Sequence, residues 1–220
     1  YFLSIESSFK PRPLLQEIRN QAVSDTVNSL TENGIGANIA DNITGILRTN
    51  ITAGGSYKDL EKQLRDSLTD NQKSDGLLTK YTKQITTDAI NQYSRQYSQV
   101  VSGDLGLEWY SYANSLIETS RPFCIAMHER DYFHVSEIPA LLEARGLYYK
   151  DPKTGSERKV QLGSNGLPAG MYDNENQSNF LTLLGGYNCG HQARPISESL
   201  VPADVQARVK ATPEYMAYKG

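Results

Sequence analysis

A run of apolar residues at every fourth position between 75 and 101 constrains the fold of this chain more than any other feature. The residues of this run are Leu77, Tyr81, Ile85, Ala89, Tyr93 and Tyr97. Residues four apart share one face of an α-helix, and a strict four-residue repeat drifts slowly around a helix of 3.6 residues per turn. The pattern therefore predicts one long helix. Its apolar stripe faces either the core of a helix bundle or, through its tyrosines, a partner protein.

Shorter apolar repeats predict further helices before this one. Residues 14–33 and 35–47 carry apolar side chains at helical spacing. Ser56 precedes Asp59 by three residues, which is the spacing of a capping box at a helix start. We therefore expect residues 1–103 to form a helical arm or bundle.

The second half of the chain has a different character. The stretch "LEWYSYANS" has the aromatic content of a strand, and Ser136 is placed to cap a short helix that follows it. Residues 148–179 are rich in Gly, Asn, Lys and Asp without periodicity, so we expect a long loop insert with at most one hairpin. We expect "FLTLLGGYNCGH" to be the last structured piece. The predicted fold class is α+β, with a mainly α-helical N-terminal half and a small, loop-rich α+β module over 104–220.

Composition and charge exclude several classes of protein. No run approaches the roughly 20 apolar residues that span a bilayer, and nothing resembles a signal peptide. A formal net charge of -3 gives no overall basic surface for nucleic acid. The two cysteines cannot form a disulfide framework, and so few cysteines suit a reducing cytosol.

The cysteines and histidines of the chain fall into two short clusters. Cys124 and His128 are four residues apart, the spacing of neighbours on one helix face. Cys189 and His191 are two apart, which suits a tight turn or one side of a strand. Together these four residues offer two sulfurs and two nitrogens, a suitable set for one tetrahedral structural zinc, and His134 is a spare candidate.

Three other interpretations of the clusters remain open at this point. The cysteines are free and half-buried beside polar histidines, or Cys124 and Cys189 form a disulfide. In the third, a cysteine is a thiol nucleophile that acts with a histidine, oriented by a residue such as Asn188. Against catalysis, Pro122 and Phe123 beside the first cysteine indicate packing, and no Gly-rich oxyanion signature surrounds it.

The order of several short motifs resembles a known family. The series "TSRPFC", "YFHVSEI" and "GGYNCGH" leading to "RPI" is similar to the C-terminal module of the Mu F-like minor head proteins of tailed phages. The resemblance covers about 53–195. Members typically show Ser-Arg-x-Phe-Cys and then Gly-Gly-x-Asn-Cys-Arg-His, so Gly190 stands where the family has arginine. The insert at 148–179 is also unusual.

The resemblance implies a structural virion protein and not an enzyme. It implies a role in head morphogenesis or DNA delivery, close to the portal, with the portal or major capsid protein, or both, and packaged DNA as partners. It places the protein in the virion head, and in the host cytoplasm during assembly. It also implies that Arg121 and Phe123 organise the module and that the closing turn is fixed by Cys124, His128, Cys189 and His191.

Two alternatives from other classes accompany this expectation. One is an enzyme, either a thiol hydrolase or a toxin-linked transferase module that uses Cys124 with a histidine. The other is a DNA-contacting delivery protein. Its local basic residues would be Lys150, Lys153, Arg158 and Lys159, although the acidic net charge argues against strong binding to phosphates.

Overall fold

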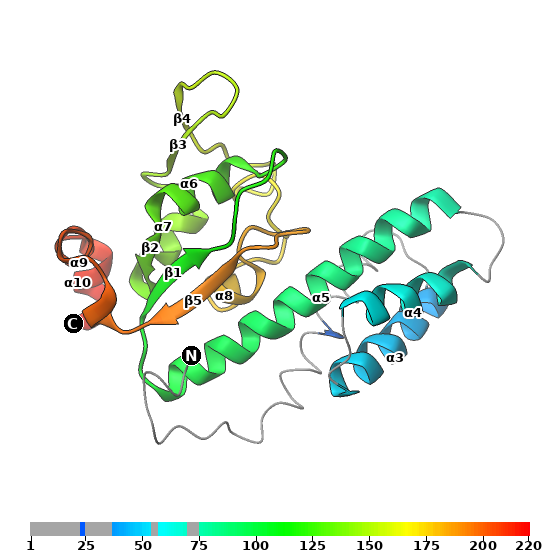
Figure 1. Ribbon diagram of the computed structural model, residues 1–220. Helices are drawn as coiled ribbons and strands as arrows, with labels where there is room; N and C mark the ends of the chain where they lie inside the picture. The colour runs from blue at the N-terminus through cyan, green and yellow to red at the C-terminus, as the bar shows by residue number, and fades with distance from the viewer. Residues whose placement is uncertain (1–22, 25–36, 54–56, 70–74) are drawn as a thin grey trace. The chain divides into compact units, whose positions relative to one another are not determined.

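The computed structural model describes residues 23–24, 37–53, 57–69 and 75–220 (Figure 1). The helices are α3 (Ala37–Ala53), α4 (Tyr57–Thr69), α5 (Asp75–Asp104), α6 (Pro122–Arg130), α7 (Ile138–Leu142), α8 (Phe180–Leu183), α9 (Ala203–Lys210) and α10 (Pro213–Lys219). The strands are β1 (Trp109–Ala113), β2 (Tyr132–His134), β3 (Tyr148–Lys150), β4 (Glu157–Lys159) and β5 (Gln192–Ile196), and the 3-10 turns are η1 (Val135–Glu137) and η2 (Glu198–Leu200). Long helices combined with small antiparallel sheets confirm the predicted α+β class.

The described residues form two compact units. One holds residues 98–187 and 191–220, and the other holds the described residues before 98 together with 188–190. The predicted helix over 14–33 lies, except for Val23 and Ser24, outside the described residues, and so does the predicted cap Ser56.

An apolar core joins the described helices of the N-terminal unit. Its buried members are Val23, Ile43, Leu47, Leu60, Leu64 and Ala89. Ile43 and Leu47 come from α3, Leu60 and Leu64 come from α4, and Ala89 comes from α5. The long helix predicted from the four-residue repeat is present as α5, and Ala89 of its stripe serves the bundle core.

A three-stranded antiparallel sheet in the order β2-β1-β5 lies at the centre of the other unit. Trp109 is opposite His134 on β2 and Ile196 on β5, and Tyr110 is opposite Phe133. Side chains alternate between the two faces of a strand, so Trp109, His134 and Ile196 share one face and Tyr110 and Phe133 share the other.

The Tyr110 face carries the larger part of the core. Its aromatic rings meet mostly edge to face, a favourable arrangement for buried aromatic pairs. Phe180 of α8 contacts Phe123 of α6 and Phe133 of β2, with centroid distances of 6.2 and 6.1 Å. Tyr112 also meets Phe123 edge to face, at 6.4 Å. Helices α6 and α8 are therefore held on the sheet by a continuous aromatic cluster.

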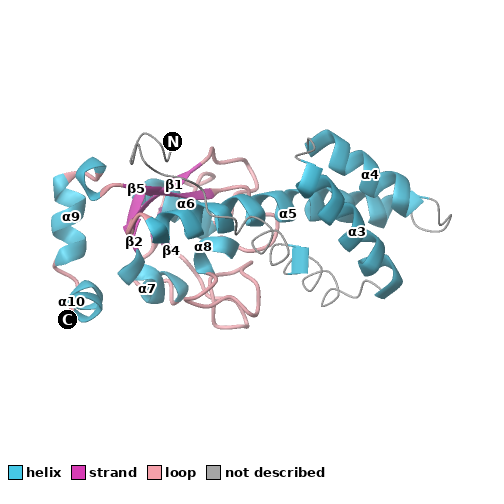
Figure 2. Cartoon of the chain, turned by 90° about the horizontal axis from the view of Figure 1, so that it is seen from below, coloured by secondary structure: helices cyan, strands magenta, loops and turns pink. Residues whose placement is uncertain are grey.

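The opposite face is covered by the C-terminal helices, which no sequence pattern predicted. Trp109 and Ile196 pack with Val201 and Val209 in a second small core, and Tyr215 of α10 packs against it. The expectation that residues 180–191 are the last structured piece is therefore wrong, since β5, α9 and α10 follow. Figure 2 shows α9 and α10 together at one end of the sheet.

Two local expectations for the second half have different outcomes. The insert contains one hairpin, β3–β4, as expected, with Tyr148 opposite Lys159, and Figure 1 shows it extending away from the sheet. The predicted cap at Ser136 is wrong, because the His134 side chain accepts the Ser136 backbone N–H and caps η1. Among the helices described, none is long and apolar enough to cross a membrane.

Candidate metal centre

Helix α6 positions the first cysteine. Arg121 has extended backbone angles and precedes Pro122, which occupies the first turn where its missing N–H costs nothing. Two residues later Cys124 is buried, with 3% of its surface exposed. The "SRPFC" motif therefore starts a helix and directs its first turn, with Phe123 and Cys124, into the interior.

The Arg121 side chain links this helix start to the second motif. Its guanidinium group donates hydrogen bonds to the carbonyl oxygens of Gly185 and Tyr187. The planar fork of arginine suits two acceptors at once, which a lysine ammonium does not reproduce. The segments "TSRPFC" and "GGYNCGH", more than 60 residues apart in sequence, therefore form one local structure.

Two glycines permit this close approach. Gly170 and Gly186 have φ of +94° and +79°, a region that residues with a Cβ rarely adopt. A Cβ on Gly186 would overlap the Gly170 carbonyl, and a Cβ on Gly170 would overlap the Arg121 side chain. By contrast, a Cβ at Gly190 meets nothing within 4 Å, so the position where the resembled family has arginine has space for a side chain.

The second cysteine lies in a short turn that is hydrogen-bonded to α5. The Asn188 N–H donates to the Asp88 carboxylate at 2.8 Å. The Cys189 carbonyl accepts from Asn91, at 3.4 Å, and from Arg95. These bonds fix the backbone that carries the Cys189 thiol, which is also buried, with 3% of its surface exposed.

Three of the four predicted ligands come together. One ligand atom from each of Cys124, Cys189 and His191 lies within 4.8 Å of the others. All three residues are buried, and the Tyr112 ring stacks on the His191 imidazole with centroids 5.0 Å apart. Both cysteines are free thiols and form no disulfide.

The donor set fits a thiophilic metal ion. Thiolate sulfur and imidazole nitrogen are the ligands that zinc prefers, at about 2.3 and about 2.0 Å from the ion. At these bond lengths tetrahedral ligand atoms are roughly 3.5–3.8 Å apart, so the observed group needs only a small contraction to bind. The buried group can therefore hold a metal ion.

The other two histidines lie outside this group. His128 is exposed, one turn beyond Cys124 on α6. A residue four positions on is rotated by about 40° around the helix, and at His128 this rotation and the approaching helix end leave the side chain in solvent. His134, the spare candidate, is fully buried on the Trp109 face of the sheet and does not join the group.

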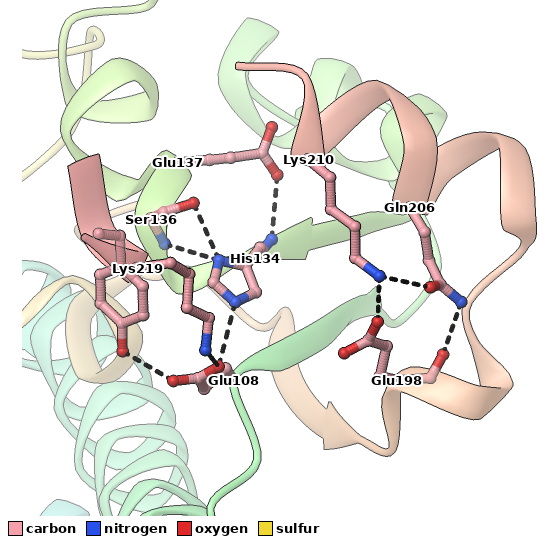
Figure 3. A network of polar contacts seen from close by, with 9 residues as sticks. Glu108, His134, Ser136, Glu137, Glu198, Gln206, Lys210 and Lys219 are labelled. Carbon is pink, nitrogen blue, oxygen red and sulfur yellow. Dashed lines mark hydrogen bonds and ion pairs between the residues drawn. The ribbon is translucent and has the colours of Figure 1, made fainter. Parts of the chain in front are cut away.

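Sequence reasoning missed a second polar cluster, drawn in Figure 3. His134 faces the Glu108 carboxylate, which also accepts hydrogen bonds from Tyr218 and Lys219 of α10. Glu108 and the α10 residues are about 110 positions apart, so no local pattern indicated their contact. The sequence does not reveal that His134 pairs with Trp109 across the sheet, and without this pairing the location of His134 cannot be predicted.

No protein-family model, curated protein or solved structure matches this chain.

Proposed function

We propose that this chain is a structural protein of a tailed-phage head, acting in head morphogenesis at the portal and in DNA delivery. One observation carries this proposal: the Arg121 side chain bonds to the carbonyls of Gly185 and Tyr187. These residues belong to the two motifs on which the resemblance to Mu F-like minor head proteins rests. The hydrogen bonds between the two motifs hold the module together, which is a role expected of motifs in a structural protein.

Within this function, one structural zinc is bound by Cys124, Cys189 and His191. The burial of all three side chains supports a structural role, because a buried ion closes a fold and is shielded from substrates. Structural zinc takes four ligands, and the described residues supply three of them. The ion would join α6 to the segment preceding β5 and add its binding energy to the stability of the fold.

A catalytic role is the second candidate, and the closeness of His191 to Cys124 favours it, because their ligand atoms lie within 4.8 Å of one another. A histidine beside a cysteine can act as the base that activates the thiol as a nucleophile, in place of a metal. A thiol hydrolase or toxin-linked transferase that uses Cys124 needs its thiol exposed to substrate. Labelling of the native protein with a thiol-reactive probe separates these roles. Rapid labelling of Cys124 favours the enzyme, and labelling only after chelation favours the structural site.

The assembly function is tested by co-purification. The tagged chain is expressed with the portal and major capsid proteins encoded beside it, and an unrelated protein with the same tag is the control. We expect a portal or capsid subunit to be retained by the chain and not by the control. Failure to retain either subunit would contradict the proposed function.

DNA is the second proposed partner, through the β3–β4 hairpin. Lys150, Lys153, Arg158 and Lys159 are all exposed there, although Arg158 is paired with Asp151 at 3.1 Å. Phosphate contacts of this kind weaken steeply with salt. Binding that is lost on replacing the three lysines by glutamate, and that falls between low and moderate salt, would support this contact. DNA binding that survives both changes would mean that DNA contacts another part of the chain and not this hairpin.

A further inference from the structure

His134 is fully buried between the sheet and helix α10, and the metal group does not use it. Its ring centroid lies 5.0 Å from that of Trp109 on β1. On the other side, it lies 4.9 Å from Tyr215 and 5.4 Å from Tyr218, both on α10. Helix α10 is therefore packed directly on the imidazole.

The hydrogen bonds of His134 fix which nitrogen carries its proton. The Ser136 backbone N–H donates to Nδ1 at 3.1 Å, and the Ser136 hydroxyl lies 2.9 Å from the same atom. Because a backbone N–H can only donate, Nδ1 must be unprotonated. The ring proton is therefore on Nε2, which faces the Glu108 carboxylate at 3.5 Å (Figure 3).

The same carboxylate anchors α10. Glu108 accepts hydrogen bonds from Lys219 Nζ at 2.5 Å and from the Tyr218 hydroxyl at 3.1 Å. The other ion pair of α10 joins Glu214 to the exposed side chain of Arg145 at 2.7 Å. Exposed ion pairs contribute little to stability. The packing of the Tyr215 and Tyr218 rings on His134 therefore carries much of the attachment.

A second proton on His134 would have to bind Nδ1 and would oppose the Ser136 N–H. The charged groups that face the ring are Glu108 before β1, Glu137 on η1, Glu198 on η2 and Lys219 on α10. Glu137 already accepts the His134 backbone N–H and pairs with Arg130, and Glu108 is bonded to Lys219. Burial lowers the pKa of His134 below its ordinary value of 6.5, although Glu108 partly offsets this effect.

We propose that His134 is an acid-sensitive latch for the C-terminal helices α9 and α10. While the imidazole is neutral, α10 is docked on it; when the imidazole is protonated, α10 detaches and uncovers the sheet face that carries Trp109 and Ile196. The sign follows from linkage: a histidine whose pKa is lowered by folding stabilises the docked state above about pH 6.5 and loses that contribution as the pH falls. The latch does not depend on the metal site or on the proposed phage function.

Trp109 provides the measurement, since it is the only tryptophan of the chain and is 2% exposed beside His134. Its emission maximum is followed from pH 8 to pH 5, together with the rate of tryptic cleavage after Arg208 and Lys210, expressed at each pH relative to the cleavage of a small peptide substrate. We expect a red shift of the emission and faster cleavage as the pH falls below about 6.5. A constant emission maximum and a constant cleavage rate over this range would overturn the latch.

The variant His134→Asn isolates the imidazole. The asparagine oxygen accepts from the Ser136 N–H and cannot be protonated in this range, so we expect the transition to disappear. His128→Asn, at an exposed histidine on α6, is the matched control and keeps the transition. If both variants keep it, His134 is not the latch.

A second variant covers the case in which His134→Asn does not fold. Lys219 is on the surface and its charge disfavours protonation of His134. Lys219→Gln removes this charge and one anchor of α10, so the transition of the folded variant should move to higher pH. An unchanged midpoint would contradict the proposed latch.

Discussion

At the scale of single residues, the second unit depends on contacts that leave no space for other side chains. Close contacts join Gly170, Gly186 and Arg121. A Cβ on Gly186 would overlap the Gly170 carbonyl, and a Cβ on Gly170 would overlap the Arg121 side chain. The Arg121 guanidinium then satisfies two carbonyls of the turn that leads to Cys189.

Gly186→Ala should be far more destabilising than a glycine substitution in open space. Both Gly186 and Gly106 have positive φ, but a Cβ at Gly106 meets nothing within 4 Å. We expect Gly106→Ala to lower the free energy of unfolding by about 1 kcal/mol, the cost of the left-handed backbone alone. Gly186→Ala should cost about 3 kcal/mol or prevent folding, because overlap adds to that cost. Urea unfolding measures both, and equal losses would show that the turn can relax.

Arg121→Lys should weaken the fold although it keeps the positive charge. A single ammonium cannot donate to both the Gly185 and Tyr187 carbonyls, and one of them loses its partner. We expect a loss of about 2 kcal/mol in the free energy of unfolding. Arg145→Lys, at a side chain that is 53% exposed, is the control and should change it by less than about 0.5 kcal/mol. Similar effects at both positions would mean that the charge, and not the fork, is what matters.

At the scale of secondary-structure elements, the long periodic segment could be predicted and the short C-terminal helices could not. The four-residue repeat predicted α5, because burial of one helix face imposes a period on the sequence. Helices α9 and α10 have eight and seven residues, too few for a clear period. Their positions follow from Trp109 and Ile196, which are distant in sequence. Serine is a common cap, so the sequence predicts Ser136 as the cap of the helix that follows it; in the structure His134 caps η1, and α7 begins without a side-chain cap.

The candidate metal site was also predicted only in part. Spacing brought Cys189 and His191 together, and the motif order paired them with Cys124. The fourth predicted ligand, His128, failed to join because helical spacing gives neighbours on one face but not which of them is buried. The hydrogen bonds of Asp88 and Arg95 to the 188–190 turn join positions about 100 residues apart, which the sequence alone does not reveal.

The aromatic cluster leads to a prediction at this scale. Phe180 is fully buried and is the only long aromatic side chain of the four-residue helix α8. Phe180→Ala should lower the free energy of unfolding by about 3–5 kcal/mol, because it removes contacts to Phe123 and Phe133 and leaves a cavity. Tyr148→Ala, at a ring that is 51% exposed on β3, should have little effect. A small loss at Phe180 in urea unfolding would mean that α8 is not needed to hold the sheet.

At the scale of the whole molecule, acid should act on two separate groups of residues. One is His134 with Glu108, and the other is the set of metal ligands. Protonation of His134 weakens the attachment of α10, and Glu108 acts in the same direction. Burial raises the pKa of Glu108, but its bonds from Lys219 and Tyr218 outweigh this effect and hold the pKa below 4.5. A carboxylate with a lowered pKa stabilises the fold above its unfolded value and loses that contribution as the pH falls. Acid also protonates metal ligands, so metal loss and latch release must be measured separately.

The central claim is that Cys124, Cys189 and His191 bind one structural zinc, and elemental analysis of the purified protein with a free-thiol count tests it most directly. We expect about one zinc per chain in the wild type and in the control His128→Ala, and none in Cys124→Ser. Chelation should release the zinc, expose two titratable thiols and lower the melting temperature. A wild-type protein without metal, whose thermal unfolding is unchanged by chelator, would contradict the claim.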